Sequence, residues 1–141
     1  MSGVSGLDAG PFSVLVDELV HGGFTVLGDT VDDERFGNAL LLLRRGATRV
    51  RVVKDRSQWF VEIAGPGSDA WFAPAVWLAM LDGELPPSPQ PLSVEEQSSL
   101  LRVRMAEIDQ ASGDETGQTL TGLKSWQAKR AAARRQEFPG S

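Results

Sequence analysis

Few residues of this chain suit catalysis, because it contains one histidine and no cysteine. With no thiolate and no second imidazole, we expect neither a zinc site nor a Ser-His or Cys-His dyad. His21 falls at the C-terminal end of an expected helix, where the helix dipole favours a cation, so we interpret it as a helix-end or surface residue. We therefore predict no catalytic residue, no metal site and no cofactor. A glycosidase-type pair of carboxylates leaves no local spacing in a sequence and stays an open alternative.

Four acids, Asp29, Asp32, Asp33 and Glu34, lie close together in the sequence. Their spacing lacks the alternate ligands and the sharp glycine turn with which an EF-hand loop wraps a calcium ion. We interpret them as part of a solvated acidic loop over residues 28–35. We expect this loop to contact a basic partner rather than a metal ion.

A group of bases follows the acids along the chain. Arg49 and Arg51 alternate with valines, which predicts a half-exposed strand with a basic outer face. Such a face could contact phosphates, but no aromatic residue alternates with the arginines to stack on bases. The chain carries a net charge of −5, so we favour pairing with acids of the same chain and do not expect a nucleic-acid partner. The bases are Arg44, Arg45, Arg49, Arg51, Lys54 and Arg56.

The other expected contact residues border the same stretch. Asp55 and Arg56 belong to a tight turn, and Trp71 follows a Gly-Pro-Gly-Ser loop that should leave it partly exposed. The predicted partner-binding set is thus Asp29, Asp32, Asp33, Glu34, Asp55, Arg56 and Trp71.

An antiparallel meander over residues 36–63 is expected to position these residues. Strands over 36–45, 48–53 and 58–63 are predicted from apolar residues that alternate or occupy both faces, and the turns between them are short. A short strand over 24–27 could add a fourth. Before the meander, a helix begins at Pro11 with one apolar stripe, formed by Phe12, Leu15, Val16, Leu19 and Val20.

Helices are expected to follow the meander. One starts near Pro74 within residues 71–82, and another opens with a capping box of Ser93 and Glu96 after a proline-rich connector at 85–91. A polar loop at 111–119 then leads to an alanine-rich basic helix. The predicted fold class is α+β, with an N-terminal helix, an antiparallel three- to four-stranded meander, then two or three helices.

The length of 141 residues fits one domain. We expect a flexible N-terminus over 1–10, an α+β domain over 11–110 and a C-terminal basic helix over 111–136 attached to it. Residues 137–141 can be encoded by adjoining restriction sites of a polylinker, so they are kept out of the functional interpretation. Neither a signal peptide nor a membrane span is indicated, and we expect a cytoplasmic protein without a membrane partner.

The combination ERFGNALLLLRRG…VRVVKDRSQWFVEI…WF…VWLAMLDGE resembles the small bacterial immunity proteins of polymorphic-toxin and contact-dependent inhibition systems. The resemblance covers residues 12–109 and concerns layout: an N-terminal helix, a meander, then helices. It implies a non-catalytic, antitoxin-like protein that binds one toxin and blocks it. These families share no binding motif, so the resemblance assigns no role to any residue. The acidic charge fits a basic toxin domain, because complementary charge speeds encounter.

Two other binding functions stay open, and so does an unrecognised small enzyme. An adaptor or secretion-chaperone-like module would bind another protein through the sheet edge or the final helix. A nucleic-acid-associated regulator would use the basic region at 44–56. The sheet edge or the C-terminal helix could also join two copies in a homodimer.

Overall fold

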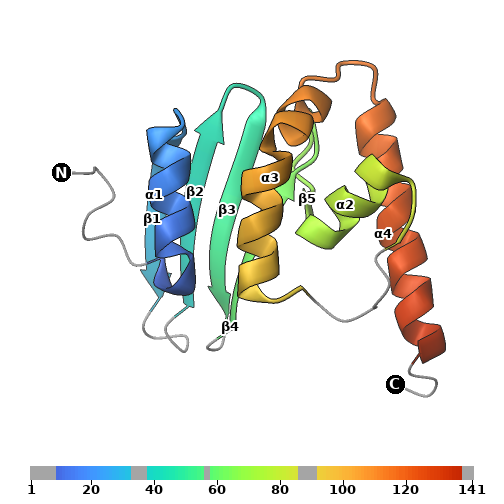
Figure 1. Ribbon diagram of the computed structural model, residues 1–141, viewed down its shortest axis with the longest axis horizontal. Helices are drawn as coiled ribbons and strands as arrows, with labels where there is room; N and C mark the ends of the chain where they lie inside the picture. Colours follow the sequence, from blue (N-terminus) through green and yellow to red (C-terminus); the bar gives the residue numbers. More distant parts are fainter. Residues whose placement is uncertain (1–8, 33–37, 56–57, 86–91, 138–141) are drawn as a thin grey trace.

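The computed structural model describes residues 9–32, 38–55, 58–85 and 92–137 (Figure 1). An N-terminal helix precedes a five-stranded antiparallel sheet, and three helices follow, which confirms the predicted α+β class. The elements are a 3-10 turn η1 (Gly10–Phe12), α1 (Ser13–His21), β1 (Thr25–Asp32), β2 (Asn38–Arg45), β3 (Thr48–Asp55), β4 (Gln58–Ala64), β5 (Trp71–Phe72), α2 (Pro74–Asp82), α3 (Val94–Ser112) and α4 (Gln118–Glu137).

The strands lie side by side in the order β1-β2-β3-β4-β5. The predicted meander is confirmed as β2, β3 and β4, and β2 has a neighbour on each side, as its two-sided apolar pattern predicts. Gly46 turns the chain between β2 and β3 with φ +58°, a conformation that favours glycine. The predicted count of three to four strands is one short, because β5 pairs with the end of β4 through two residues.

The loop predicted over residues 28–35 is wrong for its first part, since β1 continues to Asp32. Glycine and aspartate are poor strand formers, which is why the sequence indicated a loop. The backbone groups of β2 that do not bond to β3 need partners, and β1 supplies them along its length. This pairing overrides the weak strand preference and ends where Asp32 pairs with Asn38. A β-bulge between Val26 and Gly28 absorbs one extra residue.

One face of the sheet forms the core. Alternate residues of the three central strands are buried there, and α1 and α3 both lie over this face (Figure 1). The predicted stripe of the first helix supplies Phe12, Leu15, Val16 and Leu19, all buried. The buried strand residues are Leu41, Leu43, Val50, Val52, Val61 and Ile63.

Polar contacts hold α3 to the sheet near both of its ends. Near the start, the side-chain oxygen of Gln97 accepts a hydrogen bond from the Val61 N–H at 3.1 Å. Near the end, Asp109 accepts hydrogen bonds from the Thr48 hydroxyl at 2.6 Å and from the Arg45 guanidinium. The Arg45 side chain also donates to the Gly22 carbonyl at 2.7 Å, so one network joins the β2–β3 turn to α1 and α3.

The C-terminal helix α4 packs beside α2 and has its own fixed start. Thr116 and Thr119 donate hydrogen bonds to Asp114, which hold the pKa of that carboxyl well below its usual range. Leu123 is fully buried. A Cβ placed on Gly65 would stand 2.7 Å from a methyl carbon of Leu120, so the absence of a side chain at Gly65 lets α4 approach the end of β4.

We expect Asp109→Ala to lower the free energy of unfolding by about 2 kcal/mol, because the buried Thr48 hydroxyl and the Arg45 guanidinium lose their shared acceptor. Urea unfolding at neutral pH measures the change. The matched control is Gln110→Ala, an exposed neighbour on the same helix, which should change the free energy by less than about 0.5 kcal/mol. Equal losses in the two variants would contradict the structural role of Asp109.

Candidate functional site

The face of the sheet opposite α1 and α3 carries apolar side chains that belong to no core. Leu40, Val53 and Phe60 are cross-strand partners on β2, β3 and β4, so they form one row across the sheet. All three are half-buried, and none belongs to the buried cluster or packs against it. An exposed antiparallel face is usually polar, so an apolar row on it is a candidate contact surface. We call this face the open face.

Charged residues lie next to this row on the open face, toward the end of β4 that pairs with β5. The Trp71 ring covers the Arg51 guanidinium, whose carbon lies 4.5 Å from the ring centroid, and Arg51 also bonds to Glu62 at 2.7 Å. Arg49 donates to the carbonyls of Gly65 and Ser68. The predicted pairing with an acid of the same chain is therefore confirmed for Arg51, whereas Arg49 bonds to backbone carbonyls instead. Neither guanidinium is free to hold a phosphate.

The structure divides the predicted partner-binding residues between two ends of the sheet. Asp32 ends β1 and Asp55 ends β3, and these strands run in the same direction on either side of β2, so both residues lie at one end of the sheet. Trp71 pairs with Ala64 at the opposite end, about 20 Å away along β4. Asp29 lies within β1, while Asp33, Glu34 and Arg56 fall outside the described residues. The predicted set is thus no single site.

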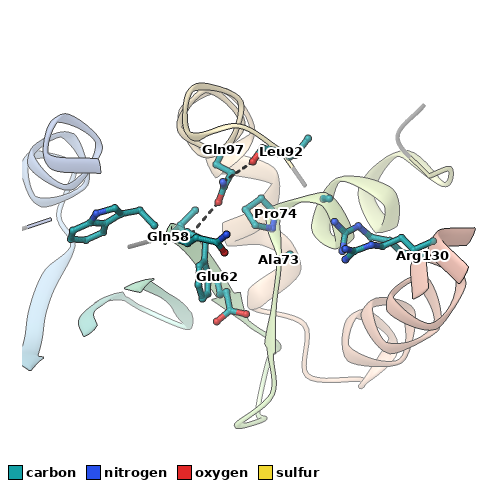
Figure 2. Close-up of a pocket in the computed structure, with 12 residues that line it drawn as sticks. Gln58, Glu62, Ala73, Pro74, Leu92, Gln97 and Arg130 are labelled. Atoms are coloured by element: carbon teal, nitrogen blue, oxygen red, sulfur yellow. Dashed lines mark hydrogen bonds between the residues drawn. The ribbon is translucent and has the colours of Figure 1, made fainter. Parts of the chain in front are cut away.

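A groove that the sequence did not indicate lies along the outer side of β4 (Figure 2). It encloses about 470 Å³. Its walls are residues 58–62 of β4, the start of α2 at Ala73–Ala75, and Arg130 and Arg134 of α4, with Leu92 and Gln97 at the side of α3. In Figure 2 the Arg130 side chain extends from α4 toward the β4 side of this groove. We call it the edge groove.

Two polar side chains satisfy part of the β4 edge beside the groove. Gln97 is buried, donates to the Leu92 carbonyl at 2.9 Å and accepts from the Val61 N–H, as the dashed lines in Figure 2 show. The buried Trp77 indole donates to the Ile63 carbonyl at 3.1 Å. Gln97 lies three and four residues before the buried Leu100 and Leu101, on the same face of α3. A polar residue at such a position is the sequence signal that could have revealed it.

Arg130 has an unusual environment for a charged group. It is half-buried, and no hydrogen bond or ion pair links it to another described residue. Burial lowers the pKa of its guanidinium, and the like charge of Arg134 one turn further along α4 lowers it further. Because neither Arg130 nor Arg134 is paired with an acid among the described residues, the α4 side of the edge groove has a positive potential. No local pattern indicates this, because it depends on where α4 packs.

Among the described residues, no group of three or more histidines, aspartates or glutamates stands where it could hold a metal ion. His21 is exposed at the end of α1, at the position predicted for it. No helix in the described part of the chain is both long and apolar enough to cross a membrane.

Comparisons with protein-family models, with curated proteins and with solved structures give no significant match.

We expect Gln97→Met to free the Val61 N–H and speed its hydrogen exchange, because methionine keeps the volume but lacks the amide acceptor. The free energy of unfolding should fall by about 1–3 kcal/mol, the usual effect of leaving a buried donor unpaired. Gln110→Met makes the same change at an exposed position of the same helix and should alter neither quantity. Unchanged exchange at Val61 in the Gln97 variant would contradict this account.

Proposed function

We propose that the protein is a non-catalytic binding module that acts as an immunity protein and blocks a partner toxin. The observation that carries this proposal is the open face, with its half-buried row of Leu40, Val53 and Phe60. A soluble protein gains by covering such a row, since each square ångström of apolar surface removed from water contributes about 25 cal/mol. A rigid sheet also loses little conformational entropy on binding.

The chemistry of the open face indicates what the partner should carry. The apolar row needs an apolar patch on the partner. Asp55 is exposed and ends β3 beside this row, and the chain has a net charge of −5, so basic residues next to that patch would be complementary. A basic toxin domain with an apolar patch on its surface would fit this face.

A function in nucleic-acid binding has less support than this one. Arg51 is paired with Glu62, and Arg49 with backbone carbonyls, so neither guanidinium is available to phosphate without breaking an internal contact. The adaptor or chaperone alternative predicts a different result in the same cells: it would keep a client soluble without protecting against a toxin.

The proposal is tested by co-expression with the toxic domain encoded next to this gene in its native genome. The wild-type chain should restore growth and bind the purified domain. Leu40→Asp and Val53→Asp should each weaken that binding more than tenfold, because they place a carboxylate in the apolar row. Circular dichroism should show that both variants remain folded.

The matched control is Val103→Asp, which adds the same charge at an exposed apolar residue on α3. This variant should protect as well as the wild type. Failure of the wild-type chain to protect would overturn the immunity function. Equal weakening by Val103→Asp would show that added charge, and not the open face, decides binding.

A further inference from the structure

The lower part of β4 lacks a neighbouring strand on its outer side. The short strand β5 pairs with Ile63 and Ala64, after which Ala73 and Pro74 lead the chain into α2. The space beside residues 58–62, which a longer β5 would occupy, is the edge groove. A strand placed there would lie about 4.8 Å from β4.

The unpaired backbone groups on this edge can be identified from Val61. Its N–H bonds to Gln97 and therefore points away from β3. Backbone groups alternate in direction along an antiparallel strand, so the N–H and C=O of Trp59 point the same way as those of Val61. Among the described residues, none bonds to the Val61 carbonyl or to either backbone group of Trp59. The edge therefore offers one donor and two acceptors.

The other edge of the sheet differs from this one in its regularity. β1 contains the bulge between Val26 and Gly28, and a bulge discourages a second chain from adding to a strand. Residues 58–62 of β4 contain no bulge in their pairing with β3. Their sequence, QWFVE, is rich in aromatic and β-branched residues that favour a strand.

The charge of the edge groove selects for an acidic ligand. Arg130 and Arg134 line it without an acidic partner among the described residues, and the one carboxylate in its lining, Glu62, is paired with Arg51. The start of α2 adds to this potential, because its N-cap residue Ala73 makes no side-chain cap. A carboxylate entering the groove would relieve the burial of the unpaired Arg130 charge.

We propose that the edge groove binds an extended acidic segment of a partner protein, which adds a strand to β4 and places its carboxylates against Arg130 and Arg134. Strand addition uses the free groups of Trp59 and Val61 for affinity, while the arginines select the side chains. A small anion would meet the arginines but leave the β4 edge unpaired. The proposal goes beyond the toxin-blocking function, because it concerns a different surface and a ligand of opposite charge.

The probe is a fluorescein-labelled peptide of about eight residues that alternates threonine and glutamate, so that its carboxylates share one face of a strand. Fluorescence polarisation should give a dissociation constant below about 1 mM for the wild-type chain. The matching threonine–glutamine peptide should bind at least tenfold more weakly. On binding of the acidic peptide, hydrogen exchange at the Trp59 N–H should slow, since that group gains an acceptor.

Arg130→Gln and Arg134→Gln should each weaken binding of the acidic peptide on the order of tenfold, because charge-assisted hydrogen bonds to carboxylates are among the stronger kinds. Arg135→Gln makes the same change at an exposed position of α4 outside the groove and should have no effect. Removing the unpaired half-buried charge of Arg130 should not unfold the protein.

Three results would overturn the proposal. One is no binding of the acidic peptide at about 1 mM, and another is equal loss of binding in the Arg130 and Arg135 variants. The third is a pair of observations: inorganic phosphate displaces the peptide at a concentration similar to that of the peptide, and the peptide does not slow hydrogen exchange at the Trp59 N–H. The groove would then be a site for small anions only. None of these results bears on Leu40 or Val53, so the toxin-blocking function stands or fails separately.

Discussion

The fold depends on the attachment of α3 to the sheet. This helix lies over the core face, contributes the buried Leu101 and Ile108, and forms ion pairs with its neighbours through Arg102 to Glu18 and Arg104 to Asp82. Hydrophobic burial favours its position without fixing its angle, because apolar contact has little direction. The amide of Gln97 and the carboxylate of Asp109 supply that direction, since hydrogen bonds weaken steeply when they are misaligned.

The two candidate surfaces follow from this arrangement. Because α1 and α3 both cover the core face, the opposite face keeps its apolar row, and because β5 ends after two residues, β4 keeps a partly free edge. The charges separate accordingly: Asp55 ends β3 beside the apolar row of the open face, while Arg130 and Arg134 of α4 line the edge groove. One small domain thus presents two contact regions of opposite charge, and a partner that matches one would be repelled by the other.

Local sequence patterns predicted most of the fold but little of the candidate sites. The stripe of α1, the strands of the meander and the capping box of Ser93 and Glu96 depend on residues close together in sequence, and all are present. The extension of β1 and the pairing of β5 depend on backbone hydrogen bonds to a neighbouring strand. Such bonds override the strand propensity of the individual residues. The edge groove joins β4 to α4, whose positions are related only through packing, so no spacing in the sequence could indicate that Arg130 belongs to it.

The link between Arg45 and Asp109 has a consequence for how the chain folds. These residues are separated by 64 positions, whereas the strands of the meander pair with immediate neighbours through short turns. Local pairings form quickly, while contacts over long loops have to overcome more chain entropy. On a ribosome, α1 and the meander would emerge first, and the part of the core face that α3 covers would wait for α3 to be synthesised. During this interval that part of the core face and the open face are both exposed, and the chain is then most in need of a chaperone.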